Sequence, residues 1–283
     1  MRFRRAARIG YAARMSAWEM TGGAVPTLRW RRGGESILAA VSTRVGGVSP
    51  APYESLNLGR STGDADAHVD ANRARFVDAL DAHHARLARI HQVHGADVLH
   101  VDGAWRDAGE RPRADGLVTR DRDRLLVVTV ADCAPVFVAH EASGTVAAVH
   151  AGWRGTAARI AAVAVERVAA LAGAPPRELT AGVGPSIGPC CFEVGEEVAW
   201  HFPAATARRA GASRPVVDLW AANAAQLEEA GLPYGSISVA GLCTSCCRDL
   251  FFSHRRDRGV TGRMIAVIGR VTSAPDPSRP RSA

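Results

Sequence analysis

One cysteine and two histidines stand where they could bind a metal ion together. Cys133 and His150 each come at the end of an apolar run typical of a buried strand, and His94 follows a similar run upstream. Two imidazoles and one thiolate form a three-ligand zinc (Zn²⁺) site with an open fourth position, which is the arrangement of catalytic rather than structural zinc. The sequence therefore predicts His94, Cys133 and His150 as metal ligands and catalytic residues.

A second chemistry is open to the same residues. Cys133 and His150 are one hairpin apart in the sequence, so their side chains could meet on adjacent strands. A thiol beside an imidazole can also form a covalent hydrolase, in which Cys133 is the nucleophile and His150 its base. Asp132, next to the thiol, either orients a histidine or caps a turn. The structural alternative is a buried cysteine with histidines that only satisfy hydrogen bonds.

Several turns and loops carry residues that could bind an anion. Arg44 offers a fork of donors, and the glycines at 46 and 47 let an anion approach the backbone. Arg154 lies in a turn before a predicted helix, whose first N–H groups attract negative charge. Arg255, in the donor-rich segment 251–257, could complete a polar site. At each position a plain turn or surface segment is the alternative.

The other five cysteines form two groups late in the chain. Cys190 and Cys191 are adjacent, and Cys243, Cys246 and Cys247 lie in a later segment. Two loops of this kind could supply a four-cysteine zinc site. Adjacent cysteines are an unusual ligand pair, however, and only one Cys-x-x-Cys spacing is present. We therefore expect reduced thiols with a structural or surface role.

Composition narrows the class of protein. The 283 residues are 47% hydrophobic, enough for a large core, and no apolar stretch reaches the roughly 20 residues of a membrane span. The chain contains no lysine, which excludes Schiff-base and Walker-type lysines. The net charge is +7, but the arginines are scattered without an aromatic-rich basic stripe, which argues against nucleic acid. Six cysteines without a signal peptide favour a reducing, cytoplasmic location.

Periodicity and turn residues predict one mixed α/β domain over residues 24–270. An Arg-rich leader, residues 1–23, and a Pro/Ser/Arg-rich tail, residues 271–283, are expected to be disordered. Strands are expected at 24–42 (two), 87–93, 97–101, 125–130, 135–140, 145–149, 179–183, 236–239 and 264–268. Helices are expected at 64–84, 156–172, 193–201 and 219–230.

Eight short segments carry a family resemblance. They are Ser42-Thr-Arg-Val-Gly-Gly-Val-Ser, Ser55-Leu-Asn-Leu-Gly, His91-Gln-Val-His-Gly, Ala114-Asp-Gly-Leu-Val-Thr, Ala131-Asp-Cys-Ala-Pro, His150-Ala-Gly-Trp-Arg-Gly, Gly184-Pro-Ser-Ile-Gly-Pro and Phe251-Phe-Ser-His-Arg-Arg-Asp. In this order, over roughly residues 35 to 270, they resemble the peptidoglycan editing factor family, also called the laccase-domain or polyphenol oxidase family. Each segment alone is weak, whereas the ordered set is specific. Ala134 departs from the pattern, since a larger apolar residue is common there.

The resemblance implies a single-domain α/β sandwich of mixed sheets, of the laccase-domain or cysteine-hydrolase-like type. It implies zinc as the cofactor, held by His94, Cys133 and His150. The family includes zinc-dependent purine nucleoside phosphorylases, so it implies phosphorolysis of adenosine, inosine, guanosine and methylthioadenosine, with adenosine deaminase side activity. Contacts to substrate or phosphate are expected from Arg44, Asn57, His91, Arg154 and Arg255.

Two other activities are attached to the resemblance. A peptidoglycan editing amidase would use Cys133 and His150 on cytosolic muropeptide precursors. A copper polyphenol oxidase is less favoured, because such enzymes use many histidines, typically in His-x-His pairs, and this chain has no such pair. We expect a cytoplasmic monomer that takes a small-molecule nucleoside and phosphate, without a nucleic-acid or membrane partner.

Overall fold

Two six-stranded sheets form the centre of the fold. The structure, a computed structural model, describes residues 17–107, 109–208 and 214–271. The first sheet has the strand order β1 (Trp18–Met20), β2 (Thr27–Trp30), β3 (Ile37–Ser42), β14 (Met264–Arg270), β7 (Arg124–Val130) and β4 (Arg86–Ala88). The second has the order β13 (Ile237–Val239), β10 (Thr180–Val183), β8 (Ala134–His140), β9 (Thr145–Ala151), β6 (Gly116–Thr119) and β5 (Val98–His100).

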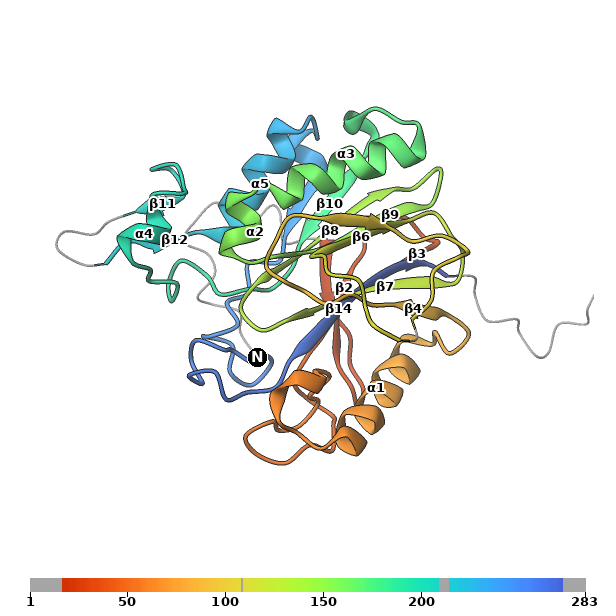
Figure 1. Ribbon diagram of the computed structural model, residues 1–283, viewed down its shortest axis with the longest axis vertical. Helices are drawn as coiled ribbons and strands as arrows, with labels where there is room; N and C mark the ends of the chain where they lie inside the picture. The colour runs from red at the N-terminus through yellow and green to blue at the C-terminus, as the bar shows by residue number, and fades with distance from the viewer. Residues whose placement is uncertain (1–16, 108, 209–213, 272–283) are drawn as a thin grey trace, which may run out of the picture.

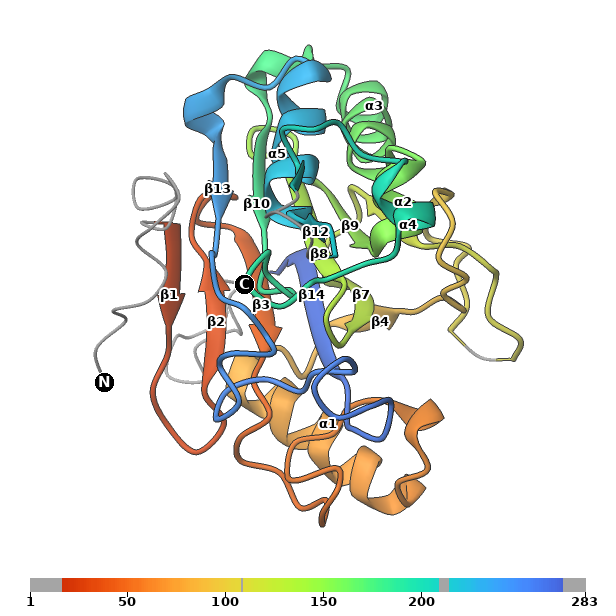
Figure 2. The same ribbon diagram turned by 90° about the vertical axis from the view of Figure 1, so that its left-hand side faces the viewer.

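Helices cover the outer faces of the two sheets, which gives four layers (Figure 1). Helix α1 (Asp66–Leu80) packs on the first sheet, while α3 (Ile160–Ala172) and α5 (Leu219–Glu229) pack on the second. Figure 2 shows the same layers from the side, with α1 at one end and α3 and α5 at the other. The predicted mixed-sheet α/β sandwich is confirmed. Among the described residues, no helix has the length and apolar character needed to cross a membrane.

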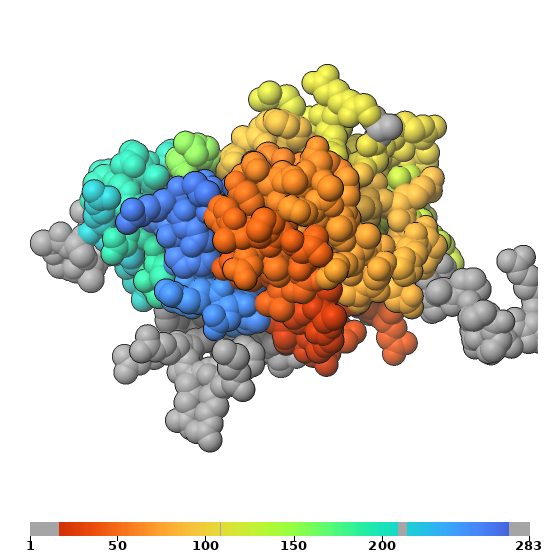
Figure 3. Space-filling view, turned by 90° about the horizontal axis from the view of Figure 1, so that it is seen from below, coloured from red at the N-terminus to blue at the C-terminus, as the bar shows by residue number. Residues whose placement is uncertain are grey.

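Short elements connect these layers. They are the helices α2 (Trp153–Ala157) and α4 (Glu196–Ala199), the 3-10 turns η2 (Arg60–Thr62), η3 (Pro176–Glu178) and η4 (Tyr234–Ser236), and the paired strands β11 (Ala207–Arg208) and β12 (Val216–Val217). On the face seen in Figure 3, the segment around α1 lies beside the C-terminal part of the chain. The two parts of the chain are joined by hydrogen bonds of the Arg263 main chain, since the Arg263 N–H donates to Asn57 Oδ1 at 2.9 Å and the Leu58 N–H donates to the Arg263 carbonyl at 3.0 Å.

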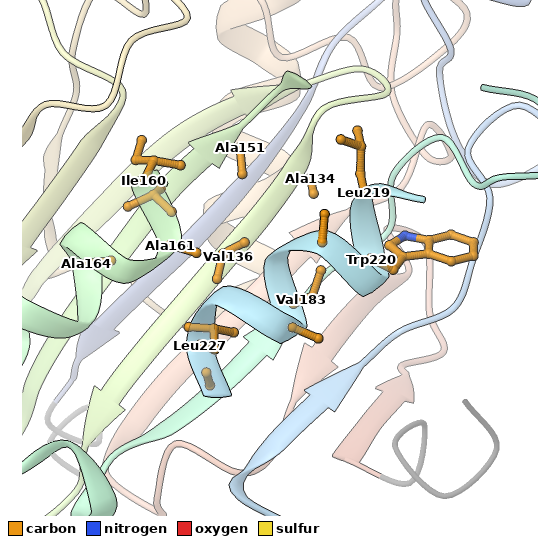
Figure 4. Close-up of a cluster of buried hydrophobic side chains, with 14 of the residues drawn as sticks. Ala134, Val136, Ala151, Ile160, Ala161, Ala164, Val183, Leu219, Trp220 and Leu227 are labelled. Carbon is orange, nitrogen blue, oxygen red and sulfur yellow. The ribbon is translucent and has the colours of Figure 1, made fainter. Parts of the chain in front are cut away.

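Strands β8 and β9 are buried on both faces, which explains their continuous apolar sequences. Val136 and Val149 belong to the cluster under α3 and α5, shown in Figure 4, whereas Phe137 and Ala148 belong to the cluster between the sheets. Side chains alternate along a strand, so Cys133, two positions before Pro135, continues the face of Phe137. His150 continues the face of Ala148 in the same way.

The core between the sheets also fixes β1. Trp18 and Trp30 both contact the Phe137 ring, with centroids 6.2 and 6.1 Å away, and the Trp30 Nε1–H donates to Ser238 Oγ at 2.7 Å. Strand β1 lies inside the leader, residues 1–23, which we expected to be disordered. This part is ordered because Trp18 packs against the buried Phe137 ring. The remainder of the leader, residues 1–16, and residues 272–283 of the tail lie outside the described residues.

Strand directions bring several loops to one edge. Strands β8 and β9 pair antiparallel with Pro135 opposite His150, so β8 begins where β9 ends. Val183 at the end of β10 pairs with Val136, and β13 runs parallel to β10. In the first sheet, Val130 at the end of β7 pairs with Met264 at the start of β14. The loops around all these strand ends can therefore share one site.

Several elements differ from their predicted lengths: the helix expected at 193–201 is only α4, the helix expected at 64–84 is the shorter α1, and two further differences have a clear physical cause. The helix expected at 156–172 is divided into α2 and α3 at Arg159, which has a left-handed backbone. The Thr156 carbonyl accepts hydrogen bonds from Gln226 of α5 and from the Arg159 N–H, which closes a turn instead of continuing the helix. The strand expected at 87–93 is only β4, because Gln92 bonds to the Thr129 main chain with its side chain.

Candidate metal centre

The structure brings His94, Cys133 and His150 together. Their ligand atoms all lie within 4.8 Å of one another, and the two imidazole rings meet edge to face with centroids 4.9 Å apart. His150 is buried, Cys133 is half-buried and His94 is exposed. The three donors match the set of a catalytic zinc site, and the exposed side leaves room for a fourth ligand.

A buried carboxylate holds two of these ligands. Asp115 precedes β6 and is fully buried. Its Oδ1 accepts hydrogen bonds from His150 Nδ1 at 2.8 Å and from the His94 N–H at 3.0 Å. Its Oδ2 accepts from the Val93 N–H at 3.1 Å and the Gly95 N–H at 2.6 Å. Asp115 therefore leaves Nε2 of His150 as the free ligand atom and fixes the turn that carries His94.

The charge of Asp115 follows from the same contacts. Burial by itself raises the pKa of the carboxyl group, but the hydrogen bonds from His150 and the main chain outweigh it and lower the pKa below its usual value. The group is thus a carboxylate at neutral pH, and it can only accept hydrogen bonds. His150 Nδ1 must therefore carry the proton in this pair.

Asp115 was not predicted as a site residue, because the segment Ala114-Asp-Gly-Leu-Val-Thr was used only for the family resemblance. The available signal was an acid directly before the buried strand β6, at a position where strand ends carry polar side chains. Asp132, which we considered as a partner for a histidine, contacts other loops instead. Its oxygens accept from Thr244 Oγ1 and from the Arg255 N–H, both at 2.6 Å.

In the metal-free protein, Cys133 and His150 stabilise each other's charges. Burial alone would raise the pKa of the Cys133 thiol, but the His150 imidazolium lowers it to about 6. Burial would lower the pKa of His150, while the Cys133 thiolate and the bond to Asp115 raise it to about 9. A thiolate is the form that a metal binds and also the form that acts as a nucleophile.

Gly152 leaves the space beside the ligands open. A Cβ atom at this position would lie 2.9 Å from Cys133 Sγ and 3.4 Å from His94 Cδ2. The backbone of Gly152 has φ −71° and ψ 175°, which other residues adopt without strain. The requirement for glycine at this position is therefore steric and comes from the ligands themselves.

Arg44 and Asn57, two of the predicted substrate-binding residues, are held in place by several contacts within the protein. The Arg44 guanidinium donates to the carbonyls of Glu54 and Arg248 and lies over the Phe252 ring. The Asn57 amide is buried and bonds to Gly59, Thr62, Asp64 and Arg263. For Asn57 these contacts favour a structural role, because both of its polar atoms already have partners.

The other three predicted residues are exposed near the strand ends. His91 lies in the same turn segment as His94, and Arg154 stacks over Trp153 at 4.2 Å. Arg255 donates from its guanidinium to the Glu193 carbonyl at 2.7 Å, and its main chain bonds to Asp132. Helix α2, which begins near Arg154, has five residues and offers only one turn of N–H groups.

Arg263 is a cation at this edge that our sequence analysis did not single out. It precedes β14, whose first residue pairs with Val130 at the end of β7, close to Cys133 in the chain. Burial lowers the pKa of its guanidinium, whereas the charges of Asp132 and Cys133 oppose that effect. Arg263 therefore lies within electrostatic reach of the metal ligand.

Comparison with known proteins links the chain to one family. The family described as "Multi-copper polyphenol oxidoreductase laccase" matches residues 38–271. Purine nucleoside phosphorylase YlmD of Geobacillus stearothermophilus is 39% identical over 246 residues, which cover 82% of this chain and 90% of that protein. A purine nucleoside phosphorylase of Deinococcus radiodurans is 43% identical over 237 residues, with coverage of 81% and 88%.

Solved structures share the fold. The crystal structure of YlmD from Geobacillus stearothermophilus superposes with a TM-score of 0.84 at 36% identity and covers 89% of this chain and 99% of that chain. A Bacillus licheniformis hypothetical protein, YfiH, gives a TM-score of 0.80 at 35% identity, with coverage of 86% and 96%.

Replacing Asp115 with Asn should weaken metal binding by about 10- to 100-fold, because the amide is uncharged and its NH₂ group would face two N–H donors that now bond to an oxygen, which leaves a metal-binding histidine poorly oriented. The affinity can be measured by competition with a chromophoric chelator. Circular dichroism should establish that the variant is folded. An unchanged affinity in a folded D115N variant would show that Asp115 does not orient the ligand.

Replacing Gly152 with Ala should abolish tight metal binding while leaving the fold intact, since the added methyl group meets Cys133 Sγ and the backbone is unstrained. Gly103→Ala is the matched control, because nothing lies within 4 Å of the Cβ it adds. Metal content after dialysis, together with the unfolding midpoint, checks both variants. Equal metal content in G152A and G103A would contradict the steric argument.

Proposed function

We propose that this chain, which belongs to the laccase-domain family described as multi-copper polyphenol oxidoreductase laccase, is a zinc-dependent purine nucleoside phosphorylase. The family prediction from the sequence is thereby confirmed. Relatives named purine nucleoside phosphorylase support the activity. The observation that carries the proposal for this chain is the donor set of His94, Cys133 and His150, oriented by the buried Asp115.

Zinc fits this donor set better than the copper of the family description. Among the described residues, two groups of three or more side chains could hold a metal ion: this one, which has two histidines, and a group of four cysteines. Two nitrogens and one sulfur suit a tetrahedral zinc ion with an open position. When bound, zinc supplies Lewis-acid stabilisation of charge that develops on an oxygen atom.

Residues of the protein would position the metal ligands and leave access for the substrate. Asp115 holds the Nδ1 proton of His150 and so prevents rotation of the ring during the reaction. His94 is exposed and Cys133 is half-buried, so the side of the site next to them would be open to solvent, and a nucleoside could enter there. We propose adenosine, inosine, guanosine and methylthioadenosine as substrates, and adenosine deamination as a side activity. The cytoplasmic location and the monomeric state remain predictions.

Arginines near the strand ends would bind the phosphate. The chain has no lysine, so a guanidinium or main-chain N–H groups must hold the anion. We propose Arg263 first, because its guanidinium interacts with the charges of Asp132 and Cys133, and Arg255 second, because its main chain bonds to Asp132. Arg44, Arg154 and His91 remain candidates at the rim, whereas Asn57 acts as a structural residue.

A second candidate function rests on the thiolate–imidazolium pair. With a pKa of about 6 for Cys133 and about 9 for His150, the metal-free protein has the charge state of a cysteine hydrolase. Cys133 would then attack a muropeptide carbonyl, and His150 would protonate the leaving amine. This activity needs no metal, so chelation separates it from phosphorolysis.

Chelation should abolish inosine phosphorolysis, and added zinc should restore it. Cys133→Ala should remove the zinc of this centre and reduce turnover by at least about 100-fold, since it deletes a ligand of the reactive ion. Hypoxanthine release with and without phosphate, beside metal analysis, checks this. Full turnover after verified zinc removal would refute the phosphorylase proposal. Muropeptide cleavage that survives chelation would favour the amidase.

Replacing Arg263 with Met should raise the KM for phosphate about tenfold or more, because one charge-assisted hydrogen bond to the anion is lost. The KM for inosine and the zinc content should change little. Arg177→Met is the control, since this arginine precedes β10 and lies at the opposite end of the strand from the site. An unchanged KM for phosphate would place the anion on other residues.

A further inference from the structure

Four thiols lie close together on two loops that contact Asp132, the residue before Cys133. The sulfur atoms of Cys190, Cys191, Cys243 and Cys246 all lie within 4.8 Å of one another. Cys246 Sγ is 3.6 Å from Cys190 Sγ and 3.4 Å from Cys191 Sγ. This group shares no residue with the centre at Cys133. The phosphorylase proposal makes no use of it.

The sheet topology explains why two distant segments meet. The adjacent Cys190 and Cys191 follow β10, Cys243 follows β13, and these strands run parallel, so both loops leave the same edge. The main chain joins the loops, since the Ser186 N–H donates to the Leu242 carbonyl at 3.3 Å and the Thr244 N–H donates to the Ser186 carbonyl at 3.0 Å. The four thiols thus face each other across a fixed pair of loops.

We propose that these four cysteines form a second metal site, a structural zinc site with four sulfur ligands. Tetrahedral zinc with Zn–S bonds of about 2.3 Å separates its sulfurs by about 3.8 Å. The separations of 3.4 and 3.6 Å from Cys246 Sγ to Cys191 Sγ and Cys190 Sγ are within a few tenths of an ångström of that value. The Cys243-Thr-Ser-Cys246 spacing is also one that structural zinc sites use.

The surroundings of the thiols support thiolate ligands. The Gly188 N–H donates to Cys243 Sγ at 3.2 Å, and such a bond favours the deprotonated sulfur that a metal requires. Cys243 is buried, while Cys190 and Cys246 are exposed. The site therefore has a buried anchor and an open side through which an ion can enter.

A pair of disulfides fits these contacts less well. A disulfide needs sulfurs about 2.05 Å apart in an exclusive pair. Cys246 instead lies at nearly equal distances from Cys190 and Cys191, so it has no single partner. Sulfurs that share neighbours in this way are expected around a central ion.

The second site would stabilise the loop behind Cys133. Thr244 lies between two of its ligands, and its hydroxyl donates to Asp132 Oδ1 at 2.6 Å. Asp132 directly precedes Cys133, and its carbonyl accepts from the Ile187 N–H of the other cysteine loop at 2.9 Å. An ion bound by the four cysteines would therefore hold both loops that contact Asp132, without contacting the substrate.

Metal analysis of the purified full-length protein tests the proposal. Wild type should contain about two zinc ions per chain, and Cys190→Ser/Cys246→Ser should contain about one. Cys133→Ser should also retain about one ion, and combining the three substitutions should remove both. Cys247→Ala is the matched control, because Cys247 is adjacent in sequence but packs against the core between the sheets. It should retain both ions.

The identity of the ligands gives a second readout in the Cys133→Ser protein. X-ray absorption at the zinc edge should show a first shell of sulfur alone, and cobalt substitution should give intense thiolate-to-metal charge transfer. A single zinc ion that Cys133→Ser removes would overturn the proposal. So would a free-thiol count showing that the four cysteines are oxidised in pairs. Neither outcome depends on nucleoside turnover. Turnover tests the phosphorylase proposal, whereas metal content and the thiol count test this site, so the two proposals can fail independently.

Discussion

The buried carboxylate of Asp115 is the interaction on which the candidate metal centre depends. An ionised carboxylate without water is costly unless donors surround it, and here one imidazole N–H and three main-chain N–H groups do so. The main-chain carbonyl of Asp115 also accepts a hydrogen bond from the main-chain N–H of His150, at 2.7 Å. Both ends of the residue are thus bound to the segments that carry His94 and His150, so the separation of these ligands follows from the main chain.

Packing of the two sheets positions the third ligand, Cys133. Strands β8 and β9 contribute alternate residues to two hydrophobic clusters, and a shift of one residue would place apolar side chains on the wrong faces. Because both faces are buried, the register that opposes Pro135 and His150 is strongly determined. Cys133, just before β8, is therefore held near His150 by the core and not by contacts of the thiol alone. The stability of the core and the geometry of the site are coupled in this way.

Much of this arrangement could be predicted from the sequence, for physical reasons. The apolar runs of β7, β8 and β9 predicted strands, and the short connection between β8 and β9 predicted the meeting of Cys133 and His150. Contacts between distant segments could not be predicted. Asp115 and His150 meet because β6 pairs with β9, the division of α2 from α3 depends on Gln226 in α5, and the Gln92 side chain replaces strand pairing. Asn57 carried a motif signal, but its polar atoms are used to join loops, which a sequence pattern does not reveal.

Two aspartates illustrate how similar side chains acquire different roles at one strand edge. Asp115 accepts an imidazole N–H and so acts on a ligand, whereas Asp132 accepts from a threonine hydroxyl and an arginine main chain and so joins loops. Asp132 is the nearer of the two to Cys133 in sequence, yet its left-handed backbone, with φ 86°, directs the chain through a sharp turn there. Proximity in sequence to a reactive residue is therefore weaker evidence of a catalytic role than the identity of the donors that a buried carboxylate receives. Here those donors place Asp115 with the metal ligands and Asp132 with the loops after β10 and β13.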